Sequence, residues 1–183
     1  RRGSAEWLAI DWHVDQDHTH TPGMCCVQGL VALADSTDKS GTIEFVRGSH
    51  RAHQKLARRH CPSENATLDG TEGVWEFVPI PPSDPLLRSD TVRPVIRAGD
   101  VVLWDARTVH RVCKPTGDAP RLVAYVCHVP RSFADAATLK RRRIFFEQAI
   151  ATTHWPHRLV DREDVRGVPR HLSDATSEVR ALV

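Results

Sequence analysis

The segment Arg121-Leu122-Val123-Ala124-Tyr125-Val126-Cys127-His128-Val129 carries the clearest strand pattern in the sequence. It is rich in valine, and residues at alternate positions would lie on one face of a sheet. Shorter apolar stretches precede it, and turn-forming residues separate them roughly every 8–20 positions. These further strand candidates cover 5–14, 42–47, 74–80, 91–97 and 101–104, together with 24–34, which is either a buried strand or a short helix. Many short strands with this spacing favour a β-sandwich or barrel.

The last part of the chain predicts helix rather than strand. Ser132 followed by Asp135 is typical of a helix start, and apolar residues then recur at helical spacing, which predicts an amphipathic helix over 133–150. A weak helix pattern follows near 173–181. We therefore expect a β core, whose N-terminal part is missing, and a C-terminal helix and tail that pack on this core; the two regions are 1–131 and 132–183.

The composition is that of an ordinary globular domain, with 183 residues, 40% hydrophobic residues and a net charge of +2. No apolar run approaches the roughly 18 residues of a membrane-spanning helix. The charge balance is too even to indicate a nucleic-acid-binding surface. Five cysteines without a C-x-x-C pair argue against a disulfide framework and a zinc finger, and they favour a reducing, cytoplasmic compartment. The chain begins with arginine rather than methionine, which is consistent with a fragment.

The candidate metal ligands are His13, Asp15 and His110. His13-Val14-Asp15 ends a predicted strand, and His110 closes a second strand-like segment 97 residues after His13. Two imidazoles and one carboxylate on one face of a metal ion leave three positions open, which is the ligand set of non-haem Fe(II) oxygenases. Two open positions suit a bidentate 2-oxo acid, and the third suits O₂. In a chain with 11 histidines, a chance surface pair is the competing interpretation of His13 and Asp15.

Arg121 is a candidate carboxylate anchor. It lies 11 residues after His110 and opens the next predicted strand. The tail carboxylate of 2-oxoglutarate must be held in a buried pocket, and a guanidinium group holds a carboxylate through two parallel hydrogen bonds. If the strand face with Arg121, Val123 and Tyr125 points inward, Arg121 needs an anion, which a bound cosubstrate supplies. A structural salt bridge is the alternative role.

Several ordered segments resemble the phytanoyl-CoA dioxygenase family of Fe(II)/2-oxoglutarate-dependent oxygenases, over roughly residues 7–130. The matching segments are Asp11-Trp12-His13-Val14-Asp15-Gln16, Val31-Ala32-Leu33-Ala34-Asp35-Ser36-Thr37, Gly41-Thr42-Ile43-Glu44-Phe45-Val46-Arg47-Gly48-Ser49-His50, Ala98-Gly99-Asp100-Val101-Val102-Leu103-Trp104-Asp105 with His110, and Pro120-Arg121-Leu122-Val123-Ala124-Tyr125. The resemblance implies a mainly β fold, a double-stranded β-helix (a cupin-like jelly roll) with a C-terminal helix. It places iron at one open end of the barrel.

The resemblance also implies roles for single residues. The iron ligands, which form the catalytic centre, are matched by His13, Asp15 and His110. Arg121 matches the anchor of the 2-oxoglutarate carboxylate, with Tyr125 and Gln28 as further cosubstrate-binding candidates. The sequence departs from the family at Val123, where many members carry a hydroxyl group, and Tyr125 is the candidate substitute on the same face.

The implied reaction oxidises a small-molecule or lipid-like substrate with Fe(II), O₂ and 2-oxoglutarate, which is decarboxylated to succinate. Asp15 favours hydroxylation, because related halogenases lack this carboxylate. Two alternatives stay open. The chain could be a catalytically inactive jelly-roll module for binding or regulation, or a cupin-like metalloenzyme that does not use 2-oxoglutarate. We expect neither a nucleic-acid nor a membrane partner.

The candidates for substrate contact are His18, His20 and Trp104. Solvated loop positions are the competing interpretation of the two histidines, and core packing is that of the tryptophan. The loops expected to face a substrate cover residues 51–73 and 79–95. The patch Thr152-Thr153-His154-Trp155-Pro156 has no predicted chemical role, and we expect it to pack against the barrel.

Overall fold

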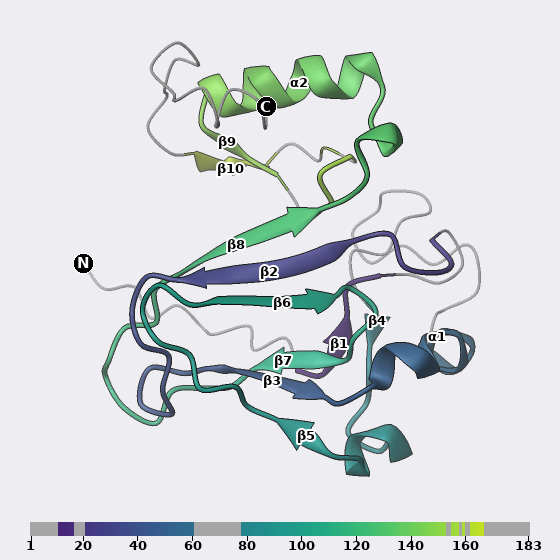
Figure 1. Ribbon diagram of the computed structural model, residues 1–183, viewed down its shortest axis with the longest axis vertical. Helices are drawn as coiled ribbons and strands as arrows, with labels where there is room; N and C mark the ends of the chain where they lie inside the picture. Colours follow the sequence, from purple (N-terminus) through teal and green to yellow (C-terminus); the bar gives the residue numbers. More distant parts are fainter. Residues whose placement is uncertain are drawn as a thin grey trace. The chain divides into compact units, whose positions relative to one another are not determined.

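The computed structural model describes residues 11–16, 21–60, 78–152, 155–157, 159 and 162–166. The chain divides into two compact units, Arg1–Val126 and Cys127–Val183 (Figure 1). The first unit contains the strands that carry the candidate site. The packing of a C-terminal region on the core stays a prediction.

The first unit contains a five-stranded antiparallel sheet in the order β4-β1-β7-β3-β5. Its strands are β1 (His13–Val14), β3 (Ile43–Val46), β4 (Val78–Pro79), β5 (Thr91–Val92) and β7 (His110–Val112). In its register, His110 lies opposite His13 on one side and opposite Phe45 on the other. Directly paired residues project to the same face of a sheet, so these three side chains are neighbours.

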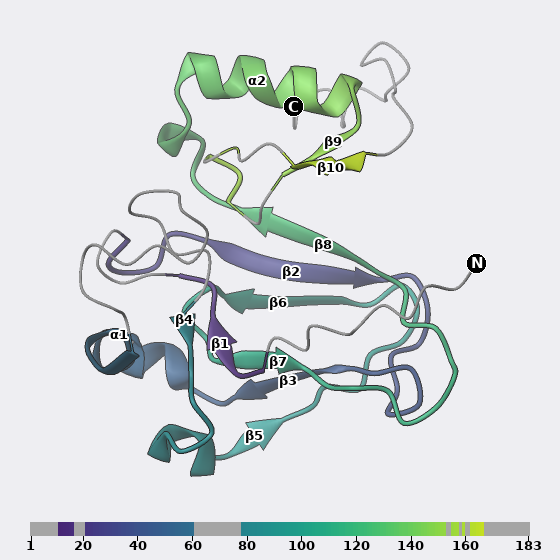
Figure 2. The same cartoon turned by 180° about the vertical axis from the view of Figure 1, so that it is seen from behind.

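A second sheet has the order β6-β2-β8, formed by β2 (Val27–Ala32), β6 (Val101–Asp105) and β8 (Val123–His128). Figures 1 and 2 show β2 and β6 lying over β7 and β3. Leu30 and Trp104 from this sheet and Ile43 and Phe45 from the other form one buried cluster, so the two inner faces enclose the core. In both sheets, neighbouring strands lie far apart in the chain. This arrangement is the jelly roll that the sequence analysis predicts.

The outer face of the five-stranded sheet is covered by three helical segments: η1 (Ser49–Ala52), α1 (His53–His60) and η2 (Pro85–Arg88). Leu56 of α1 is fully buried against Val14, Val46 and Val109, which lie on that face. These helical segments are not predicted from the sequence, in which 51–73 is expected to be a loop. Six of the eight residues of α1 are polar or charged, and its two apolar residues are adjacent in the sequence. The apolar residues therefore do not recur at helical spacing, which is the signal that would predict a helix.

The predicted strands are present but mostly shorter. The stretch 24–34, left open between strand and helix, contains β2. Only Thr91–Val92 of 91–97 forms a strand, and Ile96 makes an isolated bridge to Ser36. Residues 5–10 and 74–77 lie outside the described part of the chain. Isolated sequence windows overestimate these strands because pairing partners, and not local propensity, decide where a strand ends.

The second unit contains η3 (Arg131–Phe133), α2 (Ala136–Glu147), β9 (Ile150–Ala151) and β10 (Arg162–Arg166). The predicted helix 133–150 is present, but both of its ends are corrected, since Ile150 belongs to β9. Its predicted amphipathic character is also corrected, because Phe145 is its one buried residue and its apolar side chains do not gather on one face. Asp135 is the N-cap, and its side chain accepts a hydrogen bond of 2.7 Å from the Thr138 N–H, whereas Ser132 lies in η3. The expected weak helix near 173–181 lies outside the described residues. The described residues form no helix long and apolar enough to cross a bilayer.

Asp84 joins α1 to η2 through a buried carboxylate. It accepts a 2.8 Å hydrogen bond from the Leu86 N–H and contacts His60 Nε2 at 2.6 Å and Arg59 Nη2 at 2.9 Å. Burial raises the pKa of Asp84, but the His60 hydrogen bond, the Leu86 N–H and the Arg59 charge outweigh it and hold the pKa below its usual value. The folded protein is therefore stabilised by the charged form of Asp84.

We expect Asp84→Asn to lower the free energy of unfolding by about 1.5–3 kcal/mol at neutral pH, because charge-assisted bonds to a buried group are lost. Since the folded pKa lies below the unfolded value of about 3.9, this contribution is complete above that pH and is lost as the pH falls through the folded pKa. Denaturant titrations at several pH values should show the two proteins converging in acid. In the matched control Asp90→Asn, which breaks an exposed pair with Arg47, we expect a change below about 1 kcal/mol.

Candidate metal centre

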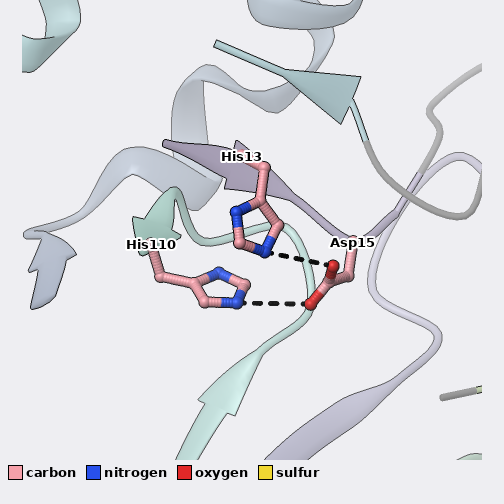
Figure 3. Close-up of side chains that lie close together, drawn as sticks. All are labelled: His13, Asp15 and His110. Atoms are coloured by element: carbon pink, nitrogen blue, oxygen red, sulfur yellow. Dashed lines mark ion pairs between the residues drawn. The ribbon is translucent and has the colours of Figure 1, made fainter. Parts of the chain in front are cut away.

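His13, Asp15 and His110 come together at one end of the jelly roll (Figure 3). The Asp15 carboxylate lies between the two rings, with Oδ1 3.4 Å from His13 Nε2 and Oδ2 3.2 Å from His110 Nε2. One ligand atom from each residue lies within 4.8 Å of the others. Both histidine side chains are buried, and Asp15 is 14% exposed. The β1–β7 pairing thus brings together the three residues that the sequence analysis singled out.

The outward ring nitrogens of both histidines face backbone carbonyls. His13 Nδ1 lies 2.7 Å from Asp11 O, and His110 Nδ1 lies 2.9 Å from Thr108 O. A carbonyl only accepts hydrogen bonds, so each Nδ1 carries the proton, and in the neutral ring Nε2 presents a lone pair. Two lone pairs and a carboxylate therefore converge on one point, and a divalent cation satisfies all three.

The electrostatics of His110 agree with this preference for positive charge. Burial lowers the pKa of His110, but the charge of Asp15 and its hydrogen bond outweigh that effect, so the pKa lies above its usual value. A buried cluster that attracts a proton also favours a metal cation, which carries more charge and binds all three groups at once.

Two buried hydrogen bonds from the segment after β3 hold the backbone beside these residues. The Ser49 hydroxyl accepts a 2.8 Å bond from the N–H of Val109, which precedes His110. His53 Nε2 lies 2.5 Å from the carbonyl of Gln16, which follows Asp15. Neither role was predicted from the sequence. The Gly48-Ser49-His50 segment directly after a strand was a usable signal for Ser49, but nothing local pointed to His53.

Aromatic rings form the wall beside His110. The centroid of the Trp104 ring lies 5.4 Å from that of His110, and the Phe45 centroid lies 6.0 Å away. Trp104 Nε1 donates a 2.9 Å hydrogen bond to Gln28 Oε1, and Gln28 is 3% exposed. Both predicted site residues, Gln28 and Trp104, therefore lie inside the barrel, and the Trp104 ring reaches the candidate metal centre.

Arg121 lies two residues before β8 and does not open the strand as predicted, but it reaches Tyr125 of that strand. Its Nη1 donates a 3.1 Å hydrogen bond to the Tyr125 hydroxyl. Its Nε and Nη2 are buried, and within the described part of the chain they meet no acceptor. Val123, between the two on the same face, packs against the core cluster. Buried guanidinium N–H groups that lack acceptors are costly, so a bound carboxylate would satisfy both of them.

Of the two loops expected to face a substrate, 79–95 is described: it contains η2 and β5, and Val92 and Pro94 line a pocket beside Trp104. The other candidates are described only in part or not at all. His18 and His20 fall in the gap at 17–20, and much of the loop 51–73 falls in the gap at 61–77. Trp155 of the Thr152–Pro156 patch is buried, whereas residues 153–154 are not described.

The sequence also matches a known protein family over the segment that contains this site. The sequence profile of the phytanoyl-CoA dioxygenase (PhyH) family matches residues 2–123, which include all three residues of the cluster and Arg121. The chain belongs to the phytanoyl-CoA dioxygenase family. This is a family of Fe(II)- and 2-oxoglutarate-dependent oxygenases, so the cofactors anticipated from the ligand set are those of the family.

One relative is "Ava biosynthesis cluster protein O" of Aspergillus versicolor, 28% identical over 164 residues, which are 87% of this chain and 52% of that protein. The chain thus spans about half the length of this curated relative. Among solved structures, the "Putative Oxidoreductase" from Salmonella typhimurium LT2 has a TM-score of 0.58 at 20% identity, over 85% of this chain and 37% of its own. A hypothetical protein from Escherichia coli has a TM-score of 0.55 at 21% identity, over 82% and 38%. These two likenesses concern the fold alone.

Proposed function

We propose that this chain is the catalytic barrel of an Fe(II)/2-oxoglutarate-dependent dioxygenase in which His13, Asp15 and His110 hold the iron. The observation that carries the proposal is the convergence of two Nε2 lone pairs and one carboxylate within 4.8 Å, each histidine being oriented by a backbone carbonyl. A facial set of two histidines and one carboxylate leaves coordination positions for a 2-oxo acid and O₂. Bound Fe(II) would supply the redox chemistry that couples 2-oxoglutarate decarboxylation to substrate oxidation.

Arg121 is the proposed partner of the distal 2-oxoglutarate carboxylate. The two buried N–H groups of its guanidinium support this role, because a carboxylate can accept from both at once. The Tyr125 hydroxyl already holds Nη1 and thereby orients the guanidinium plane. Gln28, whose Oε1 is held by Trp104, would present its amide N–H₂ to the same cosubstrate.

We further propose hydroxylation of a small, partly apolar molecule, in which substrate, O₂ and 2-oxoglutarate give hydroxylated product, succinate and CO₂. An open pocket of about 400 Å³ adjoins Phe45 and Trp104, the two rings beside His110, although the three proposed metal ligands are not among its lining residues. Its other apolar walls are Val46, Val92, Pro94, Val102 and Leu103, and its polar side chains are Arg47, His50, Asp105 and Thr108. This volume lies in the range of ordinary ligand pockets, roughly 300–1,000 Å³. The biosynthesis-cluster name of the Aspergillus relative also supports a small-molecule substrate.

An anaerobic titration tests the proposal directly. We expect Fe(II) to bind, and 2-oxoglutarate then to bind only in its presence, with a visible metal-to-ligand charge-transfer band. On admission of O₂, succinate should form even without the true substrate, although slowly. Metal binding without 2-oxoglutarate binding would favour a metalloenzyme that does not use this cosubstrate. A folded chain that binds neither would favour the non-catalytic module.

A further inference from the structure

The β1–β7 pairing that joins the two candidate metal-binding histidines is short. β1 spans His13–Val14, and in the described register His13 opposite His110 is its paired position with β7. A ladder this short has little cooperative hydrogen bonding of its own. The separation of the two imidazoles therefore depends on contacts outside the ladder.

Arg111 makes such contacts on the opposite face of the same sheet. Because side chains alternate along a strand, His110 points into the barrel and Arg111 points away from it. The Arg111 guanidinium reaches three neighbours: its Cζ lies 4.4 Å from the centroid of the Trp12 ring, its Nη1 lies 3.3 Å from Asp11 Oδ1, and its Nη2 lies 2.8 Å from Glu44 Oε2. Arg111 thus connects β7 to β3 on one side and to the residues before β1 on the other.

Asp11 links this outer face to the candidate metal centre. Its side chain accepts from Arg111, while its backbone carbonyl lies 2.7 Å from His13 Nδ1. Asp11 and Trp12 directly precede His13, so a guanidinium that holds both also holds the residue that orients the His13 ring.

Glu44 is the buried carboxylate that holds the Arg111 guanidinium. Its side chain is 8% exposed and also receives Arg93 Nε at 3.2 Å and the Thr91 hydroxyl at 3.1 Å. Burial raises the pKa of Glu44, but the hydrogen bonds from Arg111 and Arg93 outweigh it and keep the pKa below its usual value. If Arg111 is replaced, Glu44 keeps Arg93 and Thr91 as partners, so the variant is expected to fold.

We propose that Arg111 is a positioning residue for the candidate metal centre, which sets the spacing of His13 and His110 by clamping the Asp11–Trp12 segment to β7 from behind the sheet. This inference rests on the proposed function, because it concerns the same metal-binding residues. The geometry also provides a matched control. Arg93 binds the same Glu44 carboxylate but has no described contact with Asp11 or Trp12.

The test compares Co(II) affinity, by ligand-field absorption, and thermal unfolding in four proteins: wild type, Arg111→Ala, Arg111→Lys and Arg93→Ala. We expect Arg111→Ala to bind Co(II) about 10- to 100-fold more weakly, the usual effect of losing a group that orients metal ligands. Arg93→Ala should lose comparable thermal stability but stay within about threefold of the wild-type affinity. Arg111→Lys keeps one charge but not the planar fork, so it should restore stability more than affinity.

Equal loss of affinity in Arg111→Ala and Arg93→Ala, or no loss in Arg111→Ala, would overturn the proposal. Hydrogen exchange of metal-free protein gives a second readout that is independent of any metal. The amides of residues 11–16 should exchange faster in Arg111→Ala than in Arg93→Ala, and equal rates count against the clamp. Should the wild type bind no metal, the proposed function fails, whereas the exchange data still decide the role of Arg111. If Arg111→Ala does not fold, the affinity and exchange of Arg111→Lys decide the question in the same way.

Discussion

An Asp15→Ala variant is expected to bind Fe(II) at least about 100-fold more weakly than the wild type and to form no measurable succinate. Groups that only orient metal ligands are worth roughly 10- to 100-fold, and Asp15 is proposed to contact the ion itself. It also supplies the only negative charge among the three converging groups of the cluster. Without it, two neutral imidazoles would compete poorly with water for a hard cation.

The fold should survive this change. The Asp15 backbone N–H keeps its 3.2 Å hydrogen bond to Ala106 O, which does not depend on the side chain. Fe(II) affinity from anaerobic titration, succinate formation under air and the unfolding temperature are the three measurements. Asp118→Ala, at an exposed carboxylate outside the cluster, is the control. An Asp15→Ala protein that keeps Fe(II) affinity within tenfold of wild type would show that the cluster is not the iron site.

Arg121→Leu is expected to raise the half-saturating concentration of 2-oxoglutarate at least about 100-fold, with Fe(II) affinity nearly unchanged. Two charge-assisted hydrogen bonds to a carboxylate contribute on the order of 3–6 kcal/mol together, and each 1.4 kcal/mol is about tenfold in binding. The metal ligands lie on other segments of the chain, so the effect should be confined to the cosubstrate.

The same variant separates a binding role from a structural role for Arg121. Its Nε and Nη2 are buried with no acceptor in the described residues, so replacing them with an apolar side chain removes a cost in the ligand-free protein. We expect Arg121→Leu to unfold at the wild-type temperature or above it, measured without 2-oxoglutarate. A structural salt bridge at Arg121 would produce the opposite sign. Arg97→Leu, at an exposed position, controls for the general loss of a surface arginine.

The barrel could be anticipated because its strands carry local signals. Residues 101–104 are continuously apolar, and residues 121–129 are valine-rich with an alternating pattern. Both stretches contain strands in the structure, Val101–Asp105 and Val123–His128. The helix α1 could not be anticipated, because Leu56 and Ala57 are the only apolar residues in its sequence and their burial depends on β1 and β3.

The candidate site divides in the same way. The sequence by itself determined which groups have the right chemistry: an H-x-D triplet, a histidine that closes a strand-like segment and an arginine that opens the next predicted strand. The structure corrects the second position, because His110 opens β7. Tertiary structure alone decided that His13 and His110, 97 residues apart, face one carboxylate, because their meeting depends on the β1–β7 register. Only the tertiary structure shows that Ser49, His53 and Arg111 contact residues next to His110, Asp15 and His13. Ligand chemistry is a property of single side chains, whereas orientation comes from contacts between segments that only the folded chain brings together.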